Sequence, residues 1–305
     1  TTDIYPSDFA WTPDWEAPDE RIDKWYHNMQ TVKESGVAVA TFQTDYDDEV
    51  GFAAKRWLID RGRDRANGNK EPFAMVASFI HPHDPYVAKP EWWNLYSDNQ
   101  IDLPECKIAP EKMDPFSRRL MDGIEASYVP LSNEEIIRAR RAYLANVSYF
   151  DSKVGEIVKT LKDINEIENT LIIVTADHGD MLGERGLWYK MNFFEHSARV
   201  PLIFSGPNVV KGNNKDSCSL VDILPTLLEV AGGGKGMLGE PIDGRSLLPL
   251  ARGEKGQKNE AIGEYCAEMT PYPVFMIRRD NFKYIHCDPD PPQLYNLDED
   301  PLEKN

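Results

Sequence analysis

Three side chains suited to chemistry lie in one short segment of the chain: Asp177, His178 and Lys190. The segment follows an apolar run over residues 171–174, whose β-branched content predicts a buried parallel strand. In open α/β sheets, ligands bind where strands end. A carboxylate beside an imidazole offers two metal ligands, and a nearby lysine offers a cation to an anionic substrate. The pattern therefore predicts a metal and anion site, although a solvated turn would explain an isolated Asp-His pair more simply.

A second polar cluster follows another predicted strand. Apolar residues over 73–80 indicate a buried strand, which ends in the sequence His-Pro-His-Asp-Pro. The prolines stiffen this loop and restrict where its imidazoles point. His83 could protonate a leaving group or hydrogen-bond to an anion, and His81 is equally plausible. A structural loop histidine is the alternative for either residue.

Other charged residues near residues 177–190 are assigned structural roles. We interpret Asp180 and Glu184 as solvated loop residues, and we expect Arg199 to form an ion pair with Glu195. A hard divalent cation takes about six ligands, mostly oxygen. Further metal ligands would therefore have to come from elsewhere in the fold.

Aromatic and acidic residues suggest a separate site for a positively charged group. Tryptophan faces combined with a carboxylate are what a quaternary ammonium group requires. Core packing is the alternative explanation for most of these tryptophans. The candidates are Trp11, Trp15, Trp25, Tyr26, His27, Asn28, Glu264 and Glu268.

The elements that must position these residues form an α/β pattern. Ser132 and Glu135 make a capping box that opens a long helix ending near Asp163. Residues 87–130 are rich in proline and predict a long surface excursion. From Gly263 onward, short segments separated by glycine and proline indicate a small β subdomain. The other predicted elements are helices over 22–34, 47–61 and 222–231, a strand over 200–205, and a hairpin that joins 274–279 to 282–287.

The composition argues against several classes of protein. A chain of 305 residues with 41% hydrophobic and 28% charged residues is typical of a globular protein. Its net charge of −17 argues against binding to nucleic acid or to an anionic membrane. No apolar run approaches the roughly 20 residues that span a bilayer. The 4 cysteines form no CxxC pair, which argues against a zinc site or a dense disulfide framework and favours a reducing, cytoplasmic compartment.

The combination of motifs resembles the sulfatase branch of the alkaline phosphatase superfamily. The string Asp-His-Gly-Asp-x-x-Gly-Glu-x-Gly-Leu-x-x-Lys over 177–190 is highly specific, and Glu-His-Ser-Ala-Arg-Val-Pro follows over 195–201. Within that branch the resemblance is to the choline-sulfatases, and it extends over nearly all 305 residues. It implies an α/β fold with a mixed sheet flanked by helices and a small C-terminal antiparallel β subdomain. Residues 1–261 would be the C-terminal portion of the catalytic domain, and residues 262–305 the β subdomain that completes the active-site side.

The resemblance also implies roles for individual residues. Asp177 and His178 would bind a divalent metal, either Ca²⁺ or Mn²⁺, because imidazole also suits transition ions. His83 and Lys190 would be the catalytic residues that contact the sulfate, with His83 a candidate general acid. The substrate would be a small sulfate ester, choline sulfate, and the enzyme would be a homo-oligomer with no nucleic-acid or membrane partner. The substrate's ammonium group would be held by Trp11, His27, Asn28 and Glu268, with Glu264 as a competitor for Glu268.

The chain departs from the family pattern at the nucleophile. Sulfatases carry a Cys/Ser-x-Pro-x-Arg motif whose first residue becomes formylglycine, and this motif is absent from the 305 residues. The family's Asp-Asp metal pair follows a strand, whereas Asp47 and Asp48 open a predicted helix. We therefore expect that the chain lacks an N-terminal part, exposes apolar surface and is inactive by itself. The alternatives are a phosphonate monoester or phosphodiester hydrolase of the same superfamily, which would not need the ammonium pocket, and a fragment without activity.

Overall fold

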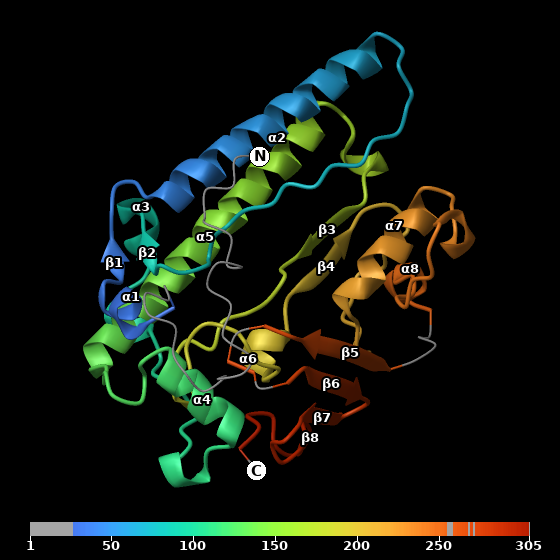
Figure 1. Ribbon diagram of the computed structural model, residues 1–305. Helices are drawn as coiled ribbons and strands as arrows, with labels where there is room; N and C mark the ends of the chain where they lie inside the picture. The colour runs from blue at the N-terminus through green and yellow to red at the C-terminus, as the bar shows by residue number, and fades with distance from the viewer. Residues whose placement is uncertain (1–26, 255–258, 268, 271, 305) are drawn as a thin grey trace.

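Two long helices, α2 (Phe42–Ala66) and α5 (Asn133–Asp163), lie side by side along one edge of the molecule (Figure 1). The Thr41 hydroxyl caps α2, which explains why this helix begins before the predicted residue 47. Helix α5 begins with the predicted capping box, in which Ser132 Oγ accepts from the Glu135 N–H and the Glu135 carboxylate accepts from the Ser132 N–H. Both caps satisfy N–H groups that a helix leaves unpaired. The computed structural model describes residues 27–254, 259–267, 269–270 and 272–304.

The shorter helices agree in part with the sequence predictions. Helix α1 (Met29–Lys33) covers the described part of the helix predicted over 22–34. Helix α7 (Ile223–Val230) confirms the prediction over 222–231, but the Asp222 carboxylate accepts from the N–H groups of Ser219 and Arg245 instead of capping α7. The remaining helices are α3 (Pro90–Trp93), α4 (Pro115–Gly123), α6 (Glu195–Ala198) and α8 (Leu248–Ala251). The 3₁₀ turns are η2 (Asp98–Gln100), η3 (Pro110–Lys112), η4 (Ile167–Asn169), η5 (Glu184–Gly186), η6 (Leu220–Asp222) and η7 (Lys235–Met237).

Two predictions for the region before α5 are wrong. Residues 73–80 form no strand, because they pair with no other strand in the described part of the chain. Their side chains alternate between half-buried and exposed, and Val76 is 88% exposed. The predicted surface excursion over 87–130 contains α4, whose Phe116 and Leu120 are buried in the core. Its proline, Pro115, stands at the first helical position, where the missing N–H costs nothing.

Strand β3 (Ile172–Thr175) pairs with β4 (Leu202–Ser205), and both predicted strands are confirmed. The predicted direction and burial of β3 are wrong, however. The pairing with β4 is antiparallel, and all four β3 residues are only partly buried. A run of β-branched residues is compatible with parallel and with antiparallel pairing, and the neighbouring strand determines which of the two forms. A short parallel pair, β1 (Gly36–Val37) with β2 (Val87–Ala88), lies beside α5.

The C-terminal strands form one antiparallel sheet in chain order (Figure 1). The strands are β5 (Glu260–Tyr265), β6 (Val274–Arg279), β7 (Phe282–Cys287) and β8 (Gln293–Asn296). The predicted hairpin is confirmed between β6 and β7, and Asp280 in its turn has a left-handed φ of 51°. The mixed α/β fold with a C-terminal antiparallel sheet is therefore confirmed, while the domain boundary at residue 261 stays a prediction. Among the described residues, no helix has the length and apolar content needed to cross a membrane.

A buried lysine connects this sheet to the rest of the molecule. Lys283 of β7 is 1% exposed, and its ammonium lies 2.5 Å from Glu195 and 2.8 Å from Glu303. It also donates to the Phe193 carbonyl at 2.8 Å. The predicted pair of Arg199 with Glu195 is wrong, because Glu195 is engaged by Lys283 and Arg199 has no ion pair within the described residues.

We expect Lys283→Met to destabilise the protein by about 3–5 kcal/mol, because the substitution leaves two carboxylates without their buried partner. Urea unfolding at neutral pH measures the change in the free energy of unfolding. The matched control is Lys159→Met, which breaks an exposed Lys159–Asp163 pair and should cost less than about 0.5 kcal/mol. Equal effects of the two substitutions would contradict a structural role for the buried triad.

Candidate active site

Three predicted site residues from two distant parts of the sequence meet near the C-terminal end of β3. Lys190 Nζ lies 2.7 Å from His83 Nε2, and the rings of His83 and His178 are 5.7 Å apart between centroids. The side chains of His83 and His178 are 27% and 30% exposed, so solvent reaches both imidazoles. The structure therefore places a cation and two imidazoles around one accessible position.

The hydrogen bonds of His83 determine which of its ring nitrogens carries the proton. Nδ1 lies 2.8 Å from the Asp84 carbonyl oxygen, which can only accept a hydrogen bond. Nδ1 must therefore donate, and the lone pair of Nε2 accepts from the Lys190 ammonium. In this arrangement His83 is neutral and Lys190 carries the positive charge.

His27 and Asp84 form a buried layer behind this pair. His27 Nε2 lies 3.4 Å from Lys190 Nζ and 3.6 Å from Asp84 Oδ1, and its ring packs on Tyr189 with centroids 4.6 Å apart. Burial lowers the pKa of His27, with the Lys190 charge acting in the same direction. Burial alone would raise the pKa of Asp84, but the contacts with His27 and with His83 outweigh it and hold that pKa below its usual range. Asp84 thus supplies one negative charge beneath several basic groups.

The cluster of His27, His83 and Asp84 could in principle hold a metal ion, since their ligand atoms lie within 4.8 Å of one another. The Lys190 ammonium, however, already occupies the lone pair of His83 Nε2 at 2.7 Å. A second cation there would meet strong repulsion, whereas an oxyanion would be attracted. The electrostatics of the cluster therefore favour an anion.

Asp177 and His178 fit the donor set of a cation site better. His178 Nδ1 donates to the Gly179 carbonyl at 2.8 Å, which leaves the Nε2 lone pair available as a ligand. Burial and the Lys190 charge lower the pKa of His178, which favours the neutral form that binds metals. The Asp177 side chain is 86% exposed, with its Oδ2 3.7 Å from His178 Nε2. A Cβ on Gly179 would come within 2.1 Å of the His196 carbonyl, so only glycine allows this close packing against α6.

The interpretation of Asp180 and Glu184 as solvated loop residues is wrong. Asp180 accepts from the Tyr86 hydroxyl at 2.8 Å, and burial raises its pKa to about 7. Glu184 is 3% exposed and lies 3.2 Å from Arg140. The sequence alone suggested surface positions for Asp180 and Glu184, because their partners, Tyr86 and Arg140, lie far away in the chain.

The two histidines of the His-Pro-His-Asp-Pro loop have different environments. His81 is 3% exposed, and its Nδ1 lies 2.7 Å from the Asp47 carboxylate. Only His83 faces Lys190, so the structure distinguishes two candidates that the sequence left equal. Asp84, in the same loop, was missed by sequence reasoning. Its position directly after His83, in a loop stiffened by prolines, was the feature of the sequence that could have indicated a role in the site.

The structure describes some of the residues predicted to hold an ammonium group, but not all of them. His27 lies in the cluster, and the neighbouring Asn28 side chain caps α1 by accepting from the Gln30 N–H at 3.0 Å. Glu264 is exposed on β5. Trp11 and Glu268 lie outside the described residues. The predicted ammonium pocket therefore stays a prediction.

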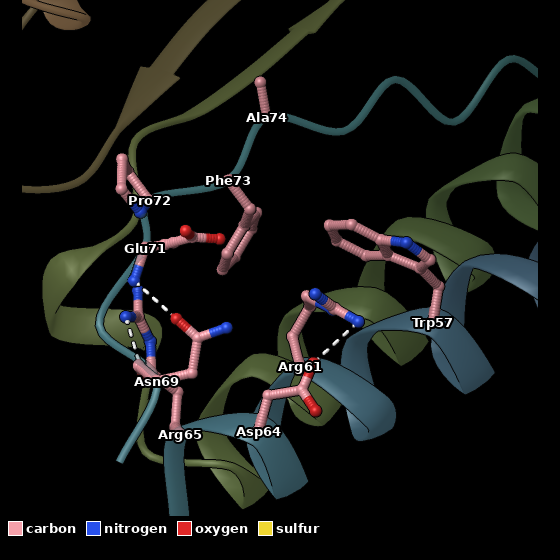
Figure 2. A pocket seen from close by; sticks show the side chains of 9 residues that line it. All are labelled: Trp57, Arg61, Asp64, Arg65, Asn69, Glu71, Pro72, Phe73 and Ala74. Atoms are coloured by element: carbon pink, nitrogen blue, oxygen red, sulfur yellow. Dashed lines mark hydrogen bonds and ion pairs between the residues drawn. The ribbon is translucent and has the colours of Figure 1, made fainter.

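A surface pocket elsewhere lies between the C-terminal half of α2 and the segment that follows it (Figure 2). Trp57 and Phe73 meet edge to face there, and Arg61 pairs with Asp64 at 2.6 Å (Figure 2). Trp57 is about 20 Å along the helix from Gln43, which contacts the Asp84 carbonyl. This pocket is separate from the cluster around Lys190.

Comparison with known proteins gives the family. A sequence model described as Sulfatase matches residues 5–233, and one described as "N-sulphoglucosamine sulphohydrolase, C-terminal" matches residues 183–305. The choline-sulfatase of Rhizobium meliloti (strain 1021) is 45% identical over 304 residues, which are 99% of this chain and 59% of that protein. Arylsulfatase K of Homo sapiens is 30% identical over 82% of this chain and 50% of that protein.

Solved structures show the same fold. The phosphonate monoester hydrolase of Agrobacterium radiobacter matches with a TM-score of 0.69 and 24% identity, over 84% of this chain and 55% of that chain. The chain thus spans between 50% and 59% of the length of these relatives. Because the sulfatase model matches residues 5–233, which include His83, Asp177, His178 and Lys190, the chain belongs to the sulfatase family.

Proposed function

We propose that this chain is part of a sulfuric ester hydrolase that converts choline sulfate and water into choline and sulfate. The observation that carries the proposal is the 2.7 Å contact between Lys190 and His83, beside His178. This contact places the positive charge of Lys190 beside an imidazole that can act as a general acid. The 45% identity to a choline-sulfatase supports choline sulfate as the substrate.

In this proposal Lys190 binds the sulfate group. Its ammonium is held between His83 and His27, so it is oriented before the substrate arrives. A positioned cation stabilises the negative charge on the sulfuryl oxygens in the transition state without further reorganisation. Asp84 carries a compensating charge, which keeps the cluster stable when no anion is bound.

His83 is assigned as the general acid. When the bond from sulfur to the choline oxygen breaks, that oxygen keeps the electron pair and needs a proton. His83 takes up a proton from solvent at Nε2 once Lys190 turns to the bound sulfate, and it passes this proton to the choline oxygen, so that Lys190 keeps its charge. The donation from Nδ1 to the Asp84 carbonyl keeps Nε2 directed at the reaction centre.

Asp177 and His178 would hold a divalent cation, Ca²⁺ or Mn²⁺, together with ligands outside the described residues. When bound, such a cation polarises the sulfuryl oxygens. The nucleophile, a formylglycine hydrate in this family, is expected outside this chain.

We further propose that Trp11, Asn28 and Glu268 hold the trimethylammonium group, with Glu264 as the competing carboxylate, while the buried His27 contacts Lys190 instead. An aromatic face with a carboxylate favours a quaternary ammonium group over a neutral alkyl group. A cytoplasmic location and a homo-oligomeric state complete the proposal, and the four free cysteines are consistent with a reducing compartment.

The full-length protein is expected to release sulfate from choline sulfate faster than it releases the alcohol from a phosphonate monoester. The chain's acidic residues and tryptophans suit an ammonium group that the phosphonate lacks. Sulfate release and alcohol release, each measured as kcat/KM, provide the comparison. Preference for the phosphonate monoester would instead favour the second hydrolase class.

Lys190→Met is expected to lower kcat for choline sulfate by about 10²–10³-fold, because a preorganised charge on the developing oxyanion is lost. The control is Lys107→Met at an exposed lysine, which should keep the parent rate. A variant at position 190 with parental kcat would exclude the assigned role for this lysine.

Glu268→Gln is expected to raise KM for choline sulfate by about 10-fold, in line with the energy of a desolvated ammonium contact, while an aryl sulfate that lacks an ammonium group is hydrolysed as before. The competing variant, Glu264→Gln, should leave both substrates unaffected. The opposite pattern would assign the ammonium contact to Glu264.

A further inference from the structure

Two polar side chains of α2 are buried on the face that meets the His-Pro-His-Asp-Pro loop. Gln43 is 2% exposed and Asp47 is 0% exposed. They stand four residues apart, which places them on the same side of the helix. Polar groups buried this deeply require hydrogen-bond partners, and the loop supplies them.

Asp47 holds the beginning of the loop. Its Oδ1 accepts from the Ile80 N–H at 2.7 Å, and its Oδ2 accepts from the His81 N–H at 3.0 Å. The same Oδ2 lies 2.7 Å from His81 Nδ1, so three donors converge on one carboxylate. The carboxylate thus fixes the backbone two residues before His83.

Gln43 holds the end of the loop. Its Nε2 donates to the Asp84 carbonyl at 2.5 Å. That carbonyl is also the acceptor for His83 Nδ1, at 2.8 Å. Gln43 therefore positions the atom that decides which ring nitrogen of His83 carries the proton.

We propose that Gln43 and Asp47 are positioning residues that set the tautomer and direction of His83. The proposal rests on the function assigned to His83 above. The loop contains two prolines without N–H groups, so few backbone hydrogen bonds can hold it, and the buried side chains of α2 take over that task. Each acts through His83, since neither reaches the accessible position beside Lys190.

Asp47 has a natural control in its neighbour. Asp48 lies on the same helix but is 41% exposed, and its carboxylate contacts Lys89, Lys153 and Tyr149 instead of the loop. Asp47→Asn and Asp48→Asn therefore each remove one carboxylate from the same helix. Only Asp47→Asn also disturbs the contacts with the loop. Asp47→Asn keeps the shape of the side chain but replaces one acceptor oxygen by a donor, so a loop N–H loses its partner.

Nitrogen NMR of the histidine rings in the full-length protein tests the proposal directly. In the parent, His83 should show a protonated Nδ1 and an unprotonated Nε2. In Asp47→Asn, and in the milder Gln43→Met, the two nitrogen shifts should move toward the average of exchanging tautomers. Asp48→Asn should give the parental spectrum. A folded Asp47→Asn or Gln43→Met with the parental His83 shifts, or a parent with a protonated Nε2, would overturn the proposal.

Kinetics with choline sulfate provide the second measurement. Asp47→Asn and Gln43→Met should each lower kcat by about tenfold or more, since small misplacements of a catalytic group have large effects on rate, while KM changes less than about threefold. Asp48→Asn should keep both constants. If the parent hydrolyses no sulfate ester, the proposed function fails and the NMR result still decides the role of α2. If the parent is active and Asp47→Asn and Gln43→Met match it, only the role of α2 is refuted.

Discussion

The hydrogen bond between the Lys190 ammonium and the His83 imidazole is the interaction on which the candidate site depends. An ammonium that is only partly solvated needs acceptors, and the Nε2 atoms of His83 and His27 are close enough to provide them. The His83 ring must then be neutral and present its Nε2 lone pair to this cation. Asp84 lies beneath both rings and compensates part of the charge. An oxyanion that enters this cluster meets a cation whose direction is already set.

The rest of the fold supports this arrangement through buried polar contacts. Helices α2 and α5 pack along their length and provide a rigid base for the loop that carries His83. On the other side of the site, Lys283 connects the C-terminal sheet to Glu195 and Glu303. Buried ion pairs of this kind contribute little net stability over apolar packing, but they are costly to break. They therefore favour one arrangement of the segments over alternatives.

The sequence predicted those features that depend on local chemistry. The capping box of Ser132 and Glu135 and the turn at Asp280 involve residues near one another in the chain, and both are confirmed. The strand expected over 73–80 failed because pairing needs a neighbouring strand, which the described part of the chain does not supply. The proline content of residues 87–130 predicted an irregular segment in place of α4. The sequence alone did not show whether Pro115 breaks a helix or begins one.

What the sequence by itself determined is the chemical identity of the site: the motif over 177–190, the His-Pro-His-Asp-Pro loop, and through them the sulfatase family. The tertiary structure alone decided that His83 faces Lys190 while His81 is buried against Asp47. It also decided that Asp180 is a partner of Tyr86 and not a solvated residue. The physical reason is that hydrogen-bond partners and desolvation come from segments far apart in the chain. Residue type and spacing carry no information about those partners until the helices and loops have packed together.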